Sequence, residues 1–280
     1  MKRIPKNLHL YWDRTNSMSL LQTFTVSTFH KLNPDWNITV YVPKQKYLGQ
    51  AKFIPDYTGK DYFSLIESME YISIKEVDLN QYGISCDLHD ILRSDILRYQ
   101  VLYNVGGVWS DFDILWLRPI THFYNIEYYG DTTIDNVSAV VSFIHGNCGG
   151  HSIGVLIHRQ HDPYVGSIVK FATQVKPPYG HESFGGNLLN AHYPDLNSLQ
   201  TFKNVIGVPF ETYYPYSIHP PTPTISKLYL DNDLSYINRN NVICLHWYNG
   251  HILSKQYVND PGGFSRDCSM TTILKNVGCI

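Results

Sequence analysis

The stretch LRSDILRYQVLYNVGGVWSDFDILWL, residues 92–117, predicts the local fold and also places charges where a packed core is expected. Before Gly106 its apolar residues recur at helical spacing, and from Val108 to Leu117 the run is apolar enough for a buried strand. A helix that leads through paired glycines into a buried strand is typical of α/β proteins. The stretch nevertheless contains Asp95, Arg98, Asp111 and Asp113.

The helical part begins and ends with clear signals. Asp87 is predicted to cap it, with Asp90 in a capping-box position, and residues 104–107 to end it. Its apolar stripe consists of Leu88, Ile91, Leu92, Tyr99 and Leu102. Asp95 falls on this stripe, and Arg98 follows three residues later. Spacing alone favours an ion pair at the edge of the stripe, worth about 0.2–0.5 kcal/mol. The alternative is a partly buried carboxylate and guanidinium that face a polar ligand.

The strand part carries two aspartates at every-other-residue spacing. Because side chains alternate along a strand, Asp111 and Asp113 should share one face, while Ser110 and Phe112 point to the other. Two carboxylates so placed repel each other unless a cation or donors lie between them. A solvated strand end is one explanation. The other is a site for Mg²⁺ or Mn²⁺ and a diphosphate, because ligands of open α/β sheets bind beyond the strand ends.

The rest of the chain extends this pattern without a visible linker or internal repeat, so its 280 residues predict one domain. A helix is expected over residues 18–32, with Ser17 as its cap and a stop at Asn33-Pro34. Strands are expected at residues 7–12, 36–42, 71–77, 137–144 and 242–247. A Gly- and His-rich stretch follows at 147–154, and the Pro- and Tyr-rich section at 208–224 is expected to form an ordered loop or a covering lid.

Composition excludes several classes of function. The net charge of −2 and the lack of a basic cluster argue against a nucleic-acid partner. Five dispersed cysteines without a C-x-x-C favour reduced thiols over a zinc site or a disulfide framework. No apolar run approaches the ~20 residues of a membrane span, so a cytoplasmic protein is expected. No G-x-G-x-x-G or P-loop motif is present, which argues against dinucleotide and P-loop chemistry.

The stretch from Ser94 to Asp113 resembles the S-D-x-x-R…G-G-x-Y-x-D-x-D signature of the DXD sugar-binding glycosyltransferases. That group includes family 32, and the catalytic domains of the clostridial glucosylating toxins are similar to it. Weaker matches to the family pattern follow in the same order along the chain: Ile4-Pro5-Lys6…His9…Trp12, Gly185-Gly186-Asn187-Leu188-Leu189, Tyr213-Tyr214-Pro215 and Leu245-His246-Trp247.

The resemblance implies a fold and an activity. The fold is the GT-A type of α/β domain, with a Rossmann-like nucleotide-sugar-binding half at residues 1–120. Residues 121–280 then form a variable acceptor-side half that ends in a metal and diphosphate segment, with the acceptor expected at 145–224. The activity is transfer of a sugar from a nucleotide diphosphate donor to a hydroxyl of a glycan acceptor, with Mn²⁺ or Mg²⁺. UDP-glucose, UDP-galactose and UDP-xylose are the preferred donors, and GDP-mannose is the runner-up.

The resemblance also implies roles for particular residues. Asp113 would bind the metal directly and His246 would be a further ligand. Asp111 would contact ribose, donor sugar or a metal-bound water. Asp95 and Arg98 would grip the hydroxyls of the donor sugar, so that Asp111, Asp95 and Arg98 form the expected catalytic set.

The resemblance also implies further contacts with the donor. Trp12 would stack on the base, and Asn187 lies in the segment that matches the family's G-P-x-x-L pattern. The chain departs from that pattern at Gly186, and it lacks the Ser-Trp that usually follows the closing His-Trp. For this reason Lys255 and His251 are both candidates for the contact with the diphosphate.

Alternatives remain beside this hypothesis. The family implies retention of configuration, whereas an inverting enzyme would need a general base, for which Glu182, His181 and His151 are candidates. A catalytically inactive nucleotide-sugar or glycan-binding protein could have the same fold. A haloacid-dehalogenase-like phosphatase also uses D-x-D after a strand, but it expects Thr or Val where this chain has Leu115.

Overall fold

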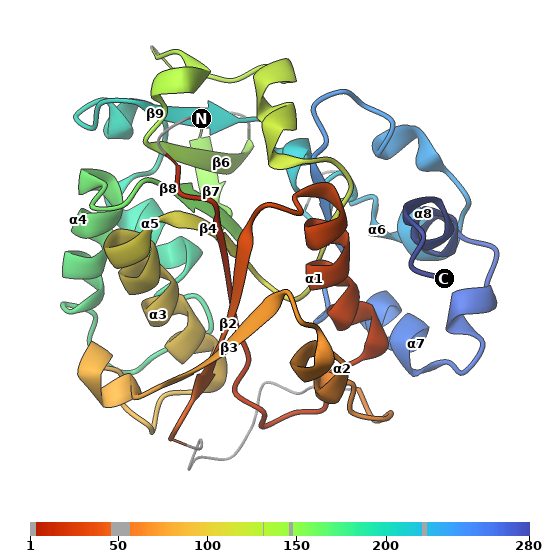
Figure 1. Ribbon diagram of the computed structural model, residues 1–280. Coiled ribbons are helices and arrows are strands. Elements are labelled where there is room, and N and C mark those ends of the chain that lie inside the picture. The colour runs from red at the N-terminus through yellow and green to blue at the C-terminus, as the bar shows by residue number, and fades with distance from the viewer. Residues whose placement is uncertain (1–3, 46–56, 131, 146–147, 220–222) are drawn as a thin grey trace.

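The computed structural model describes residues 4–45, 57–130, 132–145, 148–219 and 223–280 (Figure 1). Residue 147 of the Gly- and His-rich stretch 147–154, and residues 220–222 of the expected loop 208–224, lie outside the described residues. The strands are β1 (Asn7–Tyr11), β2 (Asn37–Pro43), β3 (Ile72–Val77), β4 (Gly107–Ser110), β5 (Ile114–Trp116), β6 (Ala139–His145), β7 (Cys148–His151), β8 (Val155–His158), β9 (Val205–Val208) and β10 (Cys244–His246).

The helices are mostly short outside the first half. They are α1 (Leu20–Leu32), α2 (Phe63–Ser68), α3 (Asp90–Val105), α4 (Pro163–Ala172), α5 (Gly186–His192), α6 (Ile225–Tyr229), α7 (Ile252–Asn259) and α8 (Ser269–Val277). Short 3₁₀ segments are η1 (Leu79–Tyr82), η2 (Ile120–Asn125), η3 (Ile134–Asn136), η4 (Asn197–Leu199), η5 (Phe210–Thr212), η6 (Leu234–Tyr236) and η7 (Gly263–Ser265). Among the described helices, none is both long and apolar enough to cross a bilayer.

One mixed sheet forms the centre of the molecule. Its strands follow the order β3-β2-β1-β4-β8-β6-β7, and β9 pairs with β6. The neighbours β3, β2, β1 and β4 are parallel, whereas β8 runs antiparallel to β4 and to β6. The α/β class expected of a GT-A-type domain, with a Rossmann-like first half, is therefore confirmed.

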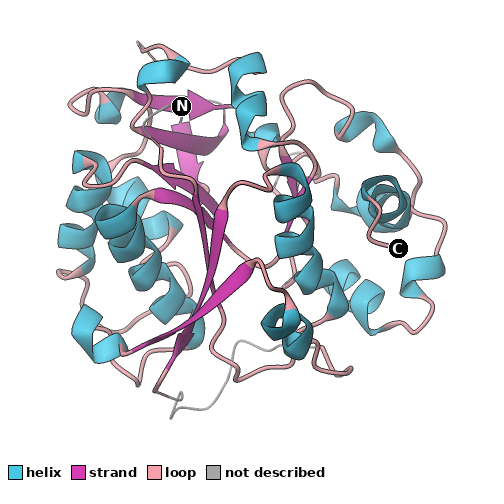
Figure 2. Ribbon diagram, viewed as in Figure 1, coloured by secondary structure: helices cyan, strands magenta, loops and turns pink. Residues whose placement is uncertain are grey.

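Two apolar layers cover this sheet, because successive side chains of a strand point to opposite faces. Leu8 and Leu10 of β1 belong to the cluster that contains α1. Trp109 of β4 belongs to the cluster that contains α3 and α4. Figures 1 and 2 show the same division: α3, α4 and α5 lie on one side of the strands, and α1 and α2 on the other. Helices α6, α7 and α8 lie beyond α1, farther from the sheet.

The helix caps differ by two residues from those predicted. Helix α1 begins after Ser19, not Ser17, and Ser19 forms a reciprocal capping box with Gln22. Helix α3 begins after His89, whose ring accepts the N–H of Ile91, so Asp87 is not the cap. The predicted stops hold, since α1 ends before Asn33 and α3 before the glycine pair.

The prediction of one continuous strand over residues 108–117 is wrong, because the structure has two strands there. The strand β4 ends at Ser110, residues 111–113 form a turn, and the chain resumes as β5. We call residues 111–113 the acid turn. A continuous strand would hold both carboxylates against buried neighbours at a cost of several kcal/mol, whereas a turn lets them reach a cleft.

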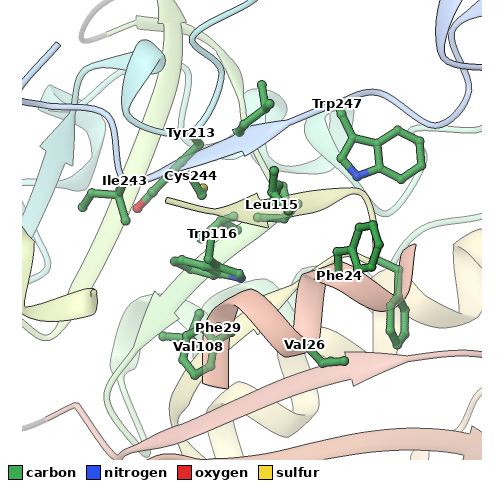
Figure 3. Close-up of a cluster of buried hydrophobic side chains, with 14 of the residues drawn as sticks. Phe24, Val26, Phe29, Val108, Leu115, Trp116, Tyr213, Ile243, Cys244 and Trp247 are labelled. Atoms are coloured by element: carbon green, nitrogen blue, oxygen red, sulfur yellow. The ribbon is translucent and has the colours of Figure 1, made fainter. Parts of the chain in front are cut away.

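The strand β5 leaves the main sheet and pairs with β10. Leu115 lies opposite Leu245, and Ile114 lies opposite His246. Around this two-stranded ladder, aromatic and aliphatic side chains from α1, β5 and β10 form a buried core, in which the rings of Trp116 and Phe29 lie 5.0 Å apart edge to face (Figure 3). The ladder therefore brings the second half of the chain against the acid turn.

Candidate active site

All eight residues expected to bind donor or metal line one cleft of about 910 Å³. The cleft opens beside the carboxyl ends of β1 and β4. The strand order reverses here, because β2 lies on one side of β1 and β4 on the other. Such a switch point is where open α/β sheets bind their ligands. The eight residues are Trp12, Asp95, Arg98, Asp111, Asp113, Asn187, His246 and Lys255.

Arg98 is the centre of a buried charge network in this cleft. Its Nη2 lies 2.7 Å from Asp95 Oδ1 and 3.4 Å from Asp111 Oδ1. Its Nη1 donates to the carbonyl of Ile153 at 2.6 Å. Asp95 and Arg98 are only 2% and 3% exposed, so the ion pair that spacing favoured does form, but it is buried and does not lie at the edge of the apolar stripe.

The neighbouring strands explain how these groups meet. The strand β8 is antiparallel to β4 and places the carbonyl of Gly154 2.9 Å from the backbone nitrogen of Asp111. Trp109, the second residue before Asp111 on the same strand face, donates its indole N–H to Asp111 Oδ1 at 3.0 Å. Asp111 is thus held by an indole on one side and a guanidinium on the other, and its direction in the cleft is fixed.

Burial changes the acidity of this network. It raises the pKa of Asp95 to about 7, although the guanidinium of Arg98 opposes the shift. The pKa of Asp111 is also raised by burial, again against the effect of Arg98. One guanidinium therefore stabilises two carboxylates that would otherwise favour protonation.

Asp113 turns away from Arg98 and toward the last strand. Its Oδ1 lies 3.3 Å from Nε2 of His246, and its Oδ2 accepts the N–H of Asn249 at 3.0 Å. The β5–β10 register is the cause, because His246 lies opposite Ile114, the residue after Asp113. His246 Nδ1 accepts the N–H of Tyr248 at 3.2 Å, which leaves Nε2 to donate to Asp113 when the ring is neutral.

The end of β1 forms another part of the cleft. The ring of Trp12 packs edge to face on Phe112 of the acid turn, with centroids 5.6 Å apart. The indole N–H of Trp12 and Oδ2 of Asp13 are buried and have no hydrogen-bond partner among the described residues. Burial, with the nearby charge of Asp13, raises the pKa of Asp90 to about 6. Sequence reasoning missed Asp13 as a cleft residue, although it is the next polar side chain after Trp12.

Residues 121–280 contribute cleft residues from short helices, short strands and loops. Asn187 lies in the first turn of α5 and is exposed, and Lys255 lies on α7. His251 caps α7 through its ring nitrogen, which accepts the N–H of Leu253 at 3.2 Å. This bond engages one ring nitrogen of His251 in the helix, and both candidates for the diphosphate, His251 and Lys255, line the cleft.

The three candidate bases have unequal positions. His151 is buried, its Nε2 donates to the carbonyl of Tyr193, and burial lowers the pKa of its ring to about 4. Glu182 is about half exposed, and its Oε2 accepts the N–H of Gly186 at 2.8 Å. His181 Nε2 lies 3.6 Å from Oε1 of Glu182. Of the three candidates, Glu182 is the carboxylate, and its charge acts on the neighbouring Asp95 and Arg98.

The residues around Gly154 are closely packed. A Cβ at this position would lie 3.0 Å from the hydroxyl of Tyr214 and 3.2 Å from Cδ2 of His246. The Tyr214 and His246 rings are 4.9 Å apart, and the Ser152 hydroxyl donates to that of Tyr214. Tyr214 was noted in the sequence only as part of an aromatic-Tyr-Pro step. Its place beside the acid turn depends on contacts between distant segments.

Residues 21–135 match the family model for the glycosyltransferase sugar-binding region containing a DXD motif. The matched segment includes both the helix with Asp95 and Arg98 and the acid turn, so the resemblance deduced from these residues is confirmed. No curated protein matches the chain.

Solved structures of glycosyltransferases resemble the chain at low identity. The PaToxG glycosyltransferase is 17% identical over 71% of this chain and 73% of its own, with a TM-score of 0.48. The galactosyltransferase LgtC, solved with donor and acceptor sugar analogs, is 13% identical over 98% of this chain and 96% of its own, with a TM-score of 0.45. The UDP-bound glycosyltransferase domain of the YGT toxin is 9% identical over 71% and 70%, with a TM-score of 0.39. Such likenesses do not carry a substrate from one protein to another.

Proposed function

We propose that this chain, a glycosyltransferase with a DXD sugar-binding region, transfers a hexosyl or pentosyl group from a UDP-sugar to a hydroxyl of a glycan acceptor, with a divalent metal. One observation carries the proposal: the Asp95–Arg98–Asp111 network and the Asp113–His246 pair line the same cleft at a topological switch point. Each of the eight residues inferred from the sequence lies in that cleft.

The charge of the cleft supports a metal. Among the described residues that line it, Arg98 and Lys255 are the cations, and they face six carboxylates: Asp13, Asp90, Asp95, Asp111, Asp113 and Glu182. A donor diphosphate adds further negative charge, so binding needs a compensating cation. No group of three or more His, Cys, Asp or Glu side chains converges on one point in the described part of the chain. A bound ion would therefore complete its shell with diphosphate oxygens and water, as Mg²⁺ commonly does.

The Asp113–His246 pair fits such an ion. Oδ1 of Asp113 and Nε2 of His246 are 3.3 Å apart. Two adjacent ligands whose bonds to a metal ion are about 2.1 Å long lie roughly 3 Å from each other, which is close to this distance. Coordination through Nε2 would move the ring proton to Nδ1, at the expense of the hydrogen bond from Tyr248. The metal would stabilise the negative charge that grows on the leaving diphosphate.

The chain's own residues would mainly position the donor. Asp95 and Asp111, held by Arg98, present carboxylate oxygens that accept hydrogen bonds from sugar or ribose hydroxyls. Asp95 and Arg98 are buried, whereas the Asp111 side chain is 31% exposed and can reach a bound ligand. Glu182, about half exposed, supplies an acceptor for the proton of an incoming hydroxyl.

The end of β1 supports a nucleotide. Trp12 offers a flat face for a base, and the unpaired Oδ2 of Asp13 suits a base that presents an N–H donor, as uracil does. Guanine presents such donors too, so GDP-mannose remains the second candidate donor.

Nucleotide release from a panel of UDP- and GDP-sugars, with and without Mn²⁺, tests the proposal. We expect release from one donor, dependent on metal, and at least about a hundredfold less with Asp113→Ala. Asp35→Ala, which removes an exposed carboxylate paired with Lys6, is the matched control and should keep full activity. Thermal unfolding of both variants checks the fold.

Two results would contradict the proposal. Turnover that survives Asp113→Ala would remove the metal role. Tight donor binding with neither hydrolysis nor transfer to any acceptor would favour the inactive-binder alternative.

A further inference from the structure

The segment after β9 places flat and aliphatic side chains along the wall of the cleft. Phe210 and Tyr214 are stacked in parallel, with ring centroids 4.4 Å apart and planes inclined by 4°. Ile218 also lines the cleft and is 37% exposed. We call Phe210, Tyr214 and Ile218 the apolar platform. Large apolar side chains that gather in a cleft beside polar groups are typical of ligand sites.

The platform is held rigidly. Tyr214 is 7% exposed, and its hydroxyl accepts a hydrogen bond from the hydroxyl of Ser152. The ring of Tyr214 therefore supports Phe210 from one side, while the ring of His219 meets Phe210 edge to face at 5.6 Å. A fixed flat surface of this kind binds a ligand without losing side-chain freedom.

The platform lies next to the reaction centre and apart from the base-binding residues. Tyr214 contacts His246, whose Nε2 lies 3.3 Å from Asp113. Trp12 contacts the acid turn through Phe112. The acid turn thus separates two aromatic surfaces, one carried by the end of β1 and one by residues 210–218. If the nucleotide occupies the first, the second adjoins the donor sugar from the metal side.

The polar groups of the cleft match a sugar. Neutral amides of Asn187, Asn190 and Asn249 line the cleft together with the carboxylate of Glu182. Amides both donate and accept, and carboxylates accept, which suits the paired donor and acceptor character of hydroxyl groups. Hexoses also have a less polar face of C–H groups, which packs on aromatic rings.

We propose that the apolar platform is the acceptor subsite and binds a hexose ring of the glycan through its C–H face. This inference rests on the proposed function and adds the position and chemical class of the acceptor. A polypeptide acceptor is the competing class, and it would not need a flat ring at position 210.

Saturation-transfer NMR tests the inference with lactose, maltose and N-acetyllactosamine as probes, on the full chain with UDP and the diamagnetic ion Mg²⁺. We expect transfer to ring protons of one sugar, mainly on one face, and about tenfold weaker binding with Phe210→Leu. Phe210→Trp, which keeps a flat ring, should retain binding. Phe171→Leu is the matched control, because Phe171 is stacked on His192 at 3.6 Å and does not line the cleft.

The controls separate the two proposals. UDP affinity, measured by calorimetry, should be the same in wild type and Phe210→Leu. If wild type binds no nucleotide, the proposed function fails and the platform has no donor beside it. If nucleotide binds but none of the sugars does, or if Phe210→Leu binds them as well as wild type, the inference is overturned. Binding of a serine- and threonine-containing peptide, but of no sugar, would likewise overturn it.

Discussion

The two halves of the chain contribute to the same cleft in different ways. Residues 1–120 supply Trp12 and the charged network from regular elements or from the residues that directly follow them: Trp12 follows β1, Asp95 and Arg98 lie within α3, and Asp111 follows β4. Residues 121–280 supply their cleft residues from loops, short helices and the ends of the short strands β7 and β10.

The difference has an energetic reason. Buried charges need partners at fixed distances, and only elements anchored in the sheet can hold them there. A flat apolar surface or an amide tolerates larger shifts, so loops can carry it. The first half thus holds the charged part of the cleft at fixed distances, and the second half supplies much of its neutral and apolar lining.

The largest expected effect concerns the charge network of the first half. Arg98→Met leaves the buried Asp95 and the partly buried Asp111 without their cation, and we expect a loss of about 3–5 kcal/mol in the free energy of unfolding. Urea denaturation measures it. Arg14→Met breaks an exposed pair with Glu67 and should cost at most about 1 kcal/mol. Equal losses for the two variants would mean that α3 does not hold a tightly coupled network.

A second test uses pH at the base-side end of the cleft. The pKa of Asp90 is raised from 3.8 to about 6, so the native chain binds this proton more tightly than the unfolded chain does. Stability from this group therefore falls as pH rises from about 4 to 6, by up to roughly 3 kcal/mol. Asp90→Asn removes the effect, so its stability relative to wild type should increase over that window. A difference that stays constant between pH 4 and pH 7 would contradict the shift.

Trp12→Ala probes the nucleotide end directly. If its ring stacks on the base, the variant should weaken UDP binding by about 1–3 kcal/mol. Calorimetry with UDP and Mn²⁺ measures the change, and Trp36→Ala, which removes a partly buried ring outside the cleft, serves as control. An unchanged dissociation constant for Trp12→Ala would exclude the ring from the site.

The smallest effect concerns a cap far from the chemistry. Ser19→Ala removes the capping box of α1 and should cost about 1 kcal/mol in unfolding free energy. Ser27→Ala, inside the same helix, removes only a bond to the carbonyl of Phe24 and should change stability by less than about 0.5 kcal/mol. If both variants behave alike, the reciprocal bonds of Ser19 and Gln22 add nothing to α1.

Sequence periodicity located most elements of the first half. The strands β1, β2 and β3 and the helices α1 and α3 occur where the pattern predicted them, because each element buries one face and the pattern reports that burial. It failed at Asp111, where an apolar run suggested one strand and the chain instead turns. A pattern of hydrophobicity cannot distinguish a continuous strand from two short ones that belong to different sheets.

The sequence by itself indicated which residues to expect together, because the S-D-x-x-R helix followed by D-x-D resembles a family pattern, and all eight of these residues line one cleft. Only the tertiary structure decided how they are partnered. Asp95 and Arg98 are buried because α3 packs on the sheet, and His246 meets Asp113 because β10 pairs with β5. Asp13 and the apolar platform were invisible in the sequence for the same reason. Contacts between segments more than a hundred residues apart depend on strand register and packing, and no local pattern records either.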